Sequence, residues 1–162
     1  MDAFSGGIHK VEASVDNSHP YINGQITYTF RYLYTERIAS LDAPKYTFPS
    51  WTGFWERRLD QKPSRVEAID ETPYWMVEIQ VVLFPMTAGK MTIEPARLSL
   101  PISSYAGRVD SPKVLTTDPI EINVHPLPQA GRPANFTGVV GQYYIHAHAD
   151  RGSVKVGDGF TL

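Results

Sequence analysis

The side chains that could coordinate a metal ion are few and poorly grouped. His146 and His148 stand two residues apart, so on a β-strand both would point to the same face. Zinc sites use such pairs but need a third ligand, and none stands nearby in the sequence. Solvent-facing histidines on a strand explain the pair more simply, because histidine is usually at least partly exposed. We therefore predict no metal site and no cofactor.

Carboxylates are the second group with catalytic potential. Asp70, Glu71, Asp110 and Asp118 would have to converge in pairs to serve as acid and base in glycoside chemistry. They stand in turn-like sequence contexts without a shared spacing. The chain has no cysteine, no serine in a nucleophile-elbow context and no glycine-rich phosphate motif. We predict that the protein is not an enzyme and has no catalytic residues.

The third group is a cluster of aromatic residues in the stretch SWTGFWERR, which spans residues 50–58. Exposed aromatic rings on a loop serve as anchors in protein interfaces or as stacking platforms for sugars. The opposite interpretation is that the loop folds over one end of the domain and buries its own rings, as large aromatic residues usually do. With both interpretations open, the candidate partner-binding residues are Trp51, Phe54 and Trp55.

The bulk properties of the chain exclude some partners. With 15 basic and 17 acidic residues the formal net charge is −2, which gives no broad basic field for nucleic acid. A length of 162 residues with 42% apolar residues is ordinary for a globular protein and allows one domain plus part of another. No apolar run of membrane-spanning length and no signal-peptide pattern is present. The abrupt start and end indicate a fragment of a longer protein, so membrane attachment would come only through segments missing from it.

Two stretches show the clearest strand periodicity. Residues 25–35 alternate with a period of two, which predicts that one bulky face enters a core: Ile26, Tyr28, Phe30, Tyr32 and Tyr34. Residues 74–100 are predicted to form a hairpin, because Pro85 ends a strand and Gly89 can supply positive φ in a turn at 87–90. The predicted core face of the first hairpin strand carries Trp75, Val77, Ile79, Val81 and Leu83.

Shorter strands are predicted at residues 8–16, 43–48, 65–70 and 120–124. Residues 50–58 show no usable period and are expected to form an ordered loop, while residues 101–118 are expected to be a long crossing segment. No segment shows a sustained helical period. The pattern predicts an all-β fold, an immunoglobulin-like antiparallel β-sandwich.

The beginning of the chain recurs near its end at a constant offset of 134 residues. The register holds without a gap over residues 11–28, with these similar positions: Ala13 and Ala147, Val15 and Ala149, Asp16 and Asp150, Ile22 and Val156, Ile26 and Phe160, and Thr27 and Thr161. Chance could produce such similarity between two strand–turn–strand segments, but a linker directly before the second copy favours duplication. We predict a β-sandwich at 1–126, a linker containing Pro and Gly at 127–138, and the first strands of a second, similar domain at 139–162.

Several motifs resemble those of one known family. They are YINGQITY at 21–28, GFW at 53–55, LFPMTAGKMTIEPA at 83–96, PLP at 126–128, and FTGVVG at 136–141 followed by VGD at 156–158. Together they resemble BatD, the oxygen-tolerance (aerotolerance) family of bacteria, over nearly the whole chain. The block at 83–96 is the most specific of these motifs.

The resemblance implies an extracytoplasmic protein of the periplasm or cell envelope, built of tandem immunoglobulin-like sandwiches and anchored in the membrane by other segments. It also implies partners encoded alongside it, namely von Willebrand factor A-type domain proteins and a MoxR-type ATPase. The family offers no established catalytic residues to carry over. The prediction is a non-enzymatic interaction or scaffold module that docks partner proteins in an envelope complex. The alternative is a carbohydrate-binding β-sandwich module.

Overall fold

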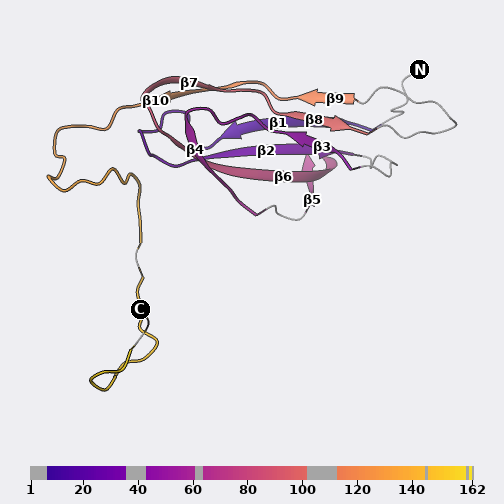
Figure 1. Ribbon diagram of the computed structural model, residues 1–162. Coiled ribbons are helices and arrows are strands. Elements are labelled where there is room, and N and C mark those ends of the chain that lie inside the picture. The colour runs from indigo at the N-terminus through magenta and orange to yellow at the C-terminus, as the bar shows by residue number, and fades with distance from the viewer. Residues whose placement is uncertain are drawn as a thin grey trace.

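The computed structural model describes residues 7–35, 43–60, 64–101, 113–144, 146–159 and 161, and within these residues there are strands but no helix (Figure 1). The strands formed by the described residues are β1 (His9–Val15), β2 (Ile26–Tyr34), β3 (Lys45–Thr47), β4 (Phe54–Arg58), β5 (Arg65–Ile69), β6 (Thr72–Pro85), β7 (Gly89–Ile93), β8 (Arg97–Leu100), β9 (Lys113–Thr116) and β10 (Ile120–Val124). The all-β class predicted from the sequence is confirmed.

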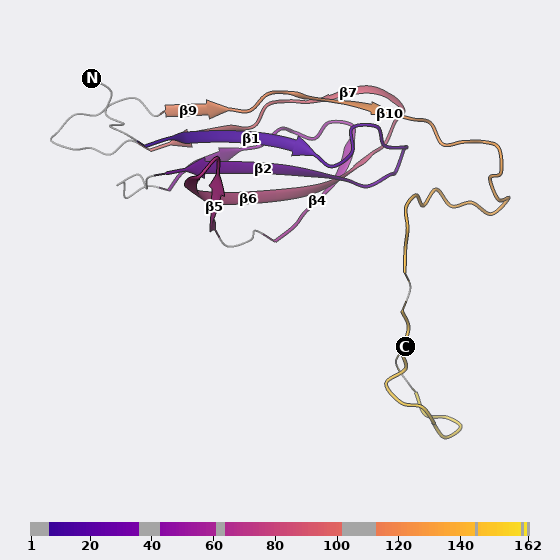
Figure 2. The ribbon, with the colours of Figure 1, turned by 180° about the vertical axis from the view of Figure 1, so that it is seen from behind.

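These strands form two layers, and every pair of them is antiparallel. The first sheet has the order β1-β2-β6-β4, and β5 also pairs with β6. The second layer consists of the pair β10-β7 and the three-stranded sheet β3-β8-β9, which continue one another because only residues 94–96 and 117–119 separate them. At this interruption the Thr117 N–H donates to the Ala96 carbonyl and the Ala96 N–H donates to Thr117 Oγ1, both over 3.0 Å. Figures 1 and 2 show the layers from opposite sides, and the predicted antiparallel β-sandwich is confirmed.

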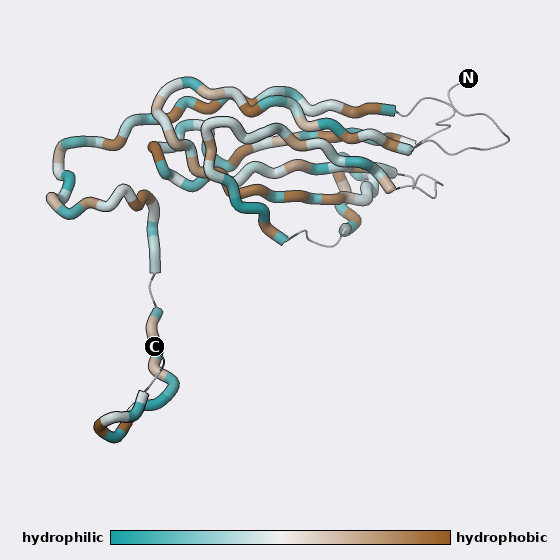
Figure 3. The backbone as a smooth tube through the Cα atoms, viewed as in Figure 1, coloured by the Kyte–Doolittle hydropathy of each residue, from teal (hydrophilic) through white to brown (hydrophobic). Residues whose placement is uncertain are grey.

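The core lies between the two layers, and its β2 face is the predicted one. Four of the five predicted β2 side chains are buried, and Tyr34 packs against them from the margin. On β6, Val81 and Leu83 are buried while Val77 and Ile79 pack against the core, so the predicted face is confirmed from Val77 to Leu83. Trp75, the fifth predicted residue, is partly exposed and lies outside the core cluster. The facing side chains from the second layer are Ile93, Leu98, Leu100, Ile122 and Val124. Figure 3 shows the alternation of apolar and polar residues along the strands that sends one face inward.

The predicted hairpin at residues 74–100 is wrong, because its two strands belong to different sheets. β6 pairs with β2, β4 and β5, whereas β7 pairs with β10. Residues 86–88 therefore carry the chain across the core from one sheet to the other. At the end of β6 both sides are already occupied: the Met86 N–H donates to the Gly53 carbonyl, and the Asn23 N–H donates to the Pro85 carbonyl. Turn residues signal that the chain reverses, but they do not say whether the two strands then pair.

Two regions predicted to lack strands contain one each. β4 lies within residues 50–58, expected to be an ordered loop, and β9 lies within residues 101–118, expected to be a crossing segment. Both strands are short, and pairing with β6 and with β8 decides their conformation where the local period does not. The strands predicted at 8–16, 43–48, 65–70 and 120–124 are found as β1, β3, β5 and β10.

The chain that follows β10 runs away from the sandwich, as Figure 1 shows. The side chain of Asn23 ties its first part to the domain, because Asn23 Nδ2 donates to the Gly138 carbonyl over 3.2 Å. Among the described residues of 139–161 there is no strand, and nearly all are exposed. The second domain expected there stays a prediction.

The hydrogen bonds at the end of the predicted repeat are the same in both copies. The Asp16 N–H donates to the Thr27 carbonyl over 3.2 Å, and the Thr27 N–H donates to Asp16 Oδ1 over 2.7 Å. At the offset of the repeat, the Asp150 N–H donates to the Thr161 carbonyl over 3.0 Å, and the Thr161 N–H donates to Asp150 Oδ1 over 3.1 Å. The match of atoms supports the register found in the sequence.

Candidate interaction surface

The three aromatic residues singled out in the sequence have different environments. Trp51 and Phe54 belong to the buried core, where the Trp51 ring meets Tyr28 edge-on at a centroid distance of 4.9 Å. Trp55, by contrast, keeps 57% of its surface exposed. The hypothesis of an aromatic partner-binding loop therefore narrows to Trp55, because the other two rings hold the end of the sandwich together.

The strand conformation of β4 explains why neighbouring aromatic residues point in opposite directions. Side chains alternate across a strand, so Phe54 enters the core and Trp55 faces outward. Trp55 lies opposite Phe84 on β6, and their rings are 5.3 Å apart at an angle of 54°. Cross-strand aromatic pairs of this kind contribute roughly 0.2–1 kcal/mol and hold both rings in place.

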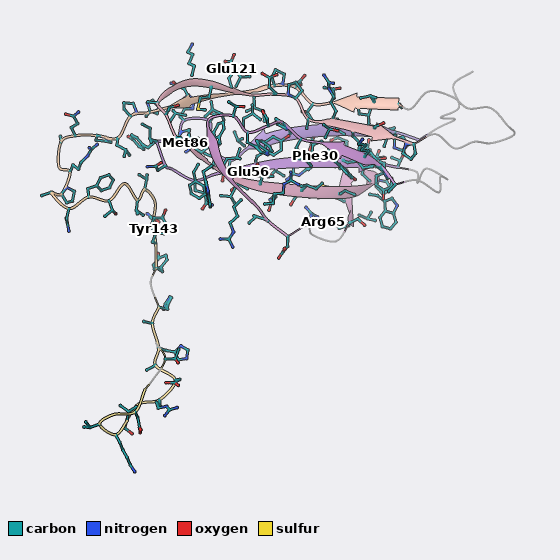
Figure 4. All side chains as sticks on the ribbon, in the orientation of Figure 1. Phe30, Glu56, Arg65, Met86, Glu121 and Tyr143 are labelled. Atoms are coloured by element: carbon teal, nitrogen blue, oxygen red, sulfur yellow. The ribbon has the colours of Figure 1, made fainter. Side chains whose placement is uncertain are left out.

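The exposed ring of Trp55 is part of a larger outward-facing group. Two residues beyond Phe84, Met86 is 55% exposed, and its N–H bond to the Gly53 carbonyl extends the β4–β6 pairing by one more residue. Arg57 lies two residues from Trp55 on the same side of β4. We refer to Trp55, Phe84, Met86 and Arg57 as the Trp55 patch. Figure 4 labels two residues in the region of this patch: Met86, which is part of it, and Glu56, the neighbour of Trp55 on β4.

The cationic side chains of β4 lack acidic partners among the described residues. In the part of the chain that the structure describes, neither Arg57 nor Arg58 forms an ion pair with a carboxylate. The Arg58 guanidinium lies 6.0 Å from the centre of the Phe48 ring, which is within the range of a cation–π contact. Both arginines are exposed, so their charges are available to a partner.

Further along the outer face of the same sheet, the charges are fully engaged. Glu78 is only 5% exposed, and its Oε2 accepts from Arg31 Nε at 3.0 Å and from Arg65 Nη2 at 3.5 Å. The hydrogen bond to Glu78 raises the pKa of Arg31, so this cation stays charged. Removing one partner from a buried ion pair leaves an uncompensated charge. This cluster therefore joins β2, β5 and β6 and is a structural feature.

The remaining sequence candidates do not converge in the described structure. Asp70 and Glu71 form the two-residue turn between β5 and β6, both with positive φ, as a type I′ hairpin turn requires. Asp118 lies in the short interruption between β9 and β10, in the other layer, and Asp110 is outside the described residues. His146 and His148 are exposed, and the described residues contain no group of three His, Asp, Glu or Cys side chains placed to hold a metal ion.

Two hollows lie away from the Trp55 patch. One, of about 410 Å³, lies over β7 and β10, with His19, Lys90 and Glu121 among its lining residues. The other, of about 330 Å³, lies where the linker folds back beside Tyr21, and it is lined mainly by apolar residues that include Phe136 and Val139. The sequence analysis predicted neither hollow: the first combines residues from three separate parts of the chain, and the second forms where the stretch 127–141 meets Tyr21.

The sequence contained a signal for the part of the patch that was missed. On β6 the face opposite the predicted core face carries three apolar residues, Met76, Val82 and Phe84. Met76 and Val82 are buried, and Phe84 is partly exposed beside Trp55. An apolar residue on the solvent side of a strand indicates a cover or a contact, and Phe84 in the motif LFPM is such a residue.

No family model, no curated protein and no solved structure matches this chain. A search of the described residues for a helix long and apolar enough to cross a bilayer finds none. The geometry of the Trp55 patch is therefore the main basis for a functional proposal.

Proposed function

We propose that the chain is a non-catalytic docking module that binds a protein partner through the Trp55 patch. The observation that carries this proposal is the exposure of Trp55, 57%, on a ring held by Phe84 next to the equally exposed Met86. Tryptophan, methionine and arginine are enriched in protein interfaces, and tryptophan and arginine dominate their binding energy. A rigid strand, in place of a loop, lowers the entropy cost of presenting these side chains.

The setting of this docking module is the cell envelope of a bacterium, in a membrane-anchored BatD-like protein. The support is the set of sequence motifs that resemble that family, above all LFPMTAGKMTIEPA at 83–96. This block contains Phe84 and Met86, so the most specific motif supplies half of the Trp55 patch. By that resemblance the partners are von Willebrand factor A-type domain proteins.

A carbohydrate-binding role is the second candidate, and one observation favours it. A partly exposed aromatic ring fixed on a β-sheet is a suitable platform for stacking against the face of a sugar ring. Trp55 is such a ring: it is 57% exposed, and its contact with Phe84 is tilted by 54° and not stacked face to face. Under this alternative the ligand is an envelope glycan, and the cationic Arg57 is not essential.

The test is affinity purification of the full-length protein from bacterial membranes, followed by mass spectrometry, for the wild type and for Trp55→Ala. The matched control is Val114→Ala, because Val114 is 55% exposed but belongs to β9 in the other sheet. We expect a protein partner that is retained by wild type and Val114→Ala and reduced at least tenfold by Trp55→Ala, since hot-spot tryptophans contribute about 2 kcal/mol or more.

The two candidate functions give different results in the same experiment. Retention on peptidoglycan or envelope polysaccharide that is lost in Trp55→Ala, without any protein partner, would favour the carbohydrate-binding role. Equal recovery of the same partner with wild type and Trp55→Ala would show that docking does not use this patch.

A further inference from the structure

We propose that the partner of this module binds as an extended strand that pairs with the open edge of β4, through an acidic–acidic–any–apolar segment. This inference rests on the proposed docking function and adds the binding mode and the chemistry of the partner. It follows from three observations: β4 is the last strand of its sheet, its backbone has donors directed outward, and its side chains form a defined pattern of charge and apolar surface.

The first observation is that the outer edge of β4 has no strand beside it in the part of the chain that the structure describes. β4 pairs with β6 alone, and it ends the order β1-β2-β6-β4. An unpaired strand edge presents a row of N–H and C=O groups that can accept a further strand. Addition of an extended peptide to such an edge is a recurrent mode of recognition, in which backbone bonds give affinity and side chains give specificity.

The second observation is the direction of the backbone groups of β4. The Met86 N–H bonds to the Gly53 carbonyl and the Leu59 N–H bonds to the Gln80 carbonyl, so positions 53 and 59 are hydrogen-bonded to the β6 side. In an antiparallel pair these positions alternate, so residues 55 and 57 also face β6, and residues 56 and 58 face away. The Phe54 N–H, which also faces away, bonds to the Trp51 carbonyl. The groups left for an added strand are therefore those of Glu56 and Arg58.

The third observation is the side-chain pattern along this edge. Trp55 and Arg57 project from the outer face, next to Phe84 and Met86, and Arg58 projects from the other face. Within the described residues the two arginines have no carboxylate partner, so the edge offers two unpaired cations and one exposed aromatic ring. Oppositely charged side chains directly across two strands stabilise the pair, and like charges destabilise it.

These positions define the sequence that fits an antiparallel strand. Its first residue lies opposite Arg58 and its second opposite Arg57, so both are acidic. Its third lies opposite Glu56 and is not acidic, and its fourth lies opposite Trp55 and is apolar. A second copy of this chain fits less well, because self-pairing centred on Glu56 sets two carboxylates opposite each other and pairing centred on Arg57 sets two guanidinium groups opposite each other.

The direct test uses fluorescence anisotropy with the 162-residue chain and a labelled peptide, Ser-Asp-Glu-Thr-Leu-Ser. We expect it to bind roughly tenfold tighter than Ser-Lys-Lys-Thr-Leu-Ser, because two cross-strand attractions become repulsions. N-methylation of the peptide at Thr, whose amide would face β4, should abolish binding, while N-methylation at Glu, whose amide would face away, should not. Equal affinity for the acidic and basic peptides, or for the two N-methylated peptides, overturns the proposal.

A pair of variants tests the same edge with the natural partner. Glu56→Pro removes an N–H that faces the open edge and is not bonded to β6, so the sheet is kept while strand addition is blocked. Glu56→Ala keeps the N–H and is the matched control, and circular dichroism of both variants checks that they are folded. We expect Glu56→Pro to lose the partner captured by the wild type and Glu56→Ala to retain it.

The outcomes separate this inference from the docking function itself. If Trp55→Ala loses the partner but a folded Glu56→Pro retains it, docking through the patch stands and strand addition is wrong. A concentration-dependent dimer of the wild-type chain, seen by sedimentation and absent in Glu56→Pro, would assign the edge to a second copy and overturn the proposal. Loss of the partner with Glu56→Pro alone among the two position-56 variants supports it.

Discussion

The two copies of the repeat share a hydrogen-bonded Asp–Thr pair but differ in everything around it. The Asp16–Thr27 pair closes the end of β1 and β2, which are paired over seven residues above the core. The Asp150–Thr161 pair makes the same two bonds in a segment where Tyr144 is 86% exposed and Val156 is fully exposed. The local sequence thus specifies a local hydrogen-bond pattern, whereas burial depends on strands that come from elsewhere in the chain.

The largest expected difference between the sandwich and the segment that holds the second copy of the repeat is in core packing. Leu83 is fully buried, so Leu83→Ala should lower the free energy of unfolding by about 2–5 kcal/mol through lost contacts and a cavity. Val156→Ala, in the second region, should leave it unchanged. Urea titration followed by tryptophan fluorescence measures both, and a comparable loss in Val156→Ala would mean that the second region packs against the first.

The second difference is the loss of folding stability at high pH. Burial raises the pKa of Tyr28 from 10.0 to about 12, and the nearby Thr117 side chain lowers it by less. The folded state holds this proton more tightly than the unfolded state does. The contribution of Tyr28 to the free energy of unfolding is therefore fully present below pH 10 and is lost as the pH rises through about 12. At 1.36 kcal/mol per pKa unit, the loss from this group amounts to about 2–3 kcal/mol.

Tyr28→Phe tests this assignment, since it removes the titrating group and keeps the ring. The Tyr28 hydroxyl is buried near Thr117, but among the described residues no hydrogen bond to it has good geometry, so the variant should be as stable as the wild type at pH 7. Between pH 10 and 12 it should lose less stability, whereas Tyr144→Phe, on an exposed ring, should follow the wild type. Thermal melts across this range measure the effect, and identical curves for all three proteins would contradict it.

The third difference compares the two Asp–Thr pairs directly. Asp16→Ala removes an acceptor 2.7 Å from the Thr27 N–H and should lower the stability of the sandwich by about 1 kcal/mol, typical of one hydrogen bond. Asp150→Ala removes the equivalent acceptor and should leave the main unfolding transition in place. Equal losses from the two variants would show that the second pair also supports the first domain.

The smallest expected effect lies at the junction of the two regions. Asn23 has φ 62° and donates to the Gly138 carbonyl, so Asn23→Gly removes the side-chain bond and keeps a residue that tolerates this backbone. Stability should change by less than about 0.5 kcal/mol. Hydrogen exchange should nevertheless become faster in residues 133–140, and unchanged exchange there would show that the bond does not hold the linker.

The parts of the fold that were predictable from the sequence are those set by the period of two. The core faces of β2 and β6 follow from alternating residues such as Phe30 and Leu83, and both are confirmed. The pairing of β6 was not predictable from its turn, because Gly89 indicates a reversal in a hairpin and in a crossover between sheets alike. β4 was not predicted, because pairing with a neighbouring strand, here β6, can set the conformation of a short segment whose own residues show no period.

The candidate site shows the same limit on a smaller scale. The aromatic stretch around Trp51 and Trp55 was identified by composition, but which rings are exposed depends on the alternation of a strand that was not predicted. Once β4 is known to be a strand, the burial of Phe54 and the exposure of Trp55 follow from it. Met86 joins the Trp55 patch only because β4 pairs with β6, and this pairing cannot be read from any local sequence pattern.

Site-specific photo-crosslinking tests the central claim, docking through the Trp55 patch, most directly. A benzophenone amino acid would be placed at position 55 or at position 114 of the full-length protein in bacterial membranes, since both side chains are exposed but lie on opposite sheets. We predict a specific crosslink to one partner protein from position 55 and none from position 114. A crosslink to the same partner from position 114 and none from position 55 would contradict the account.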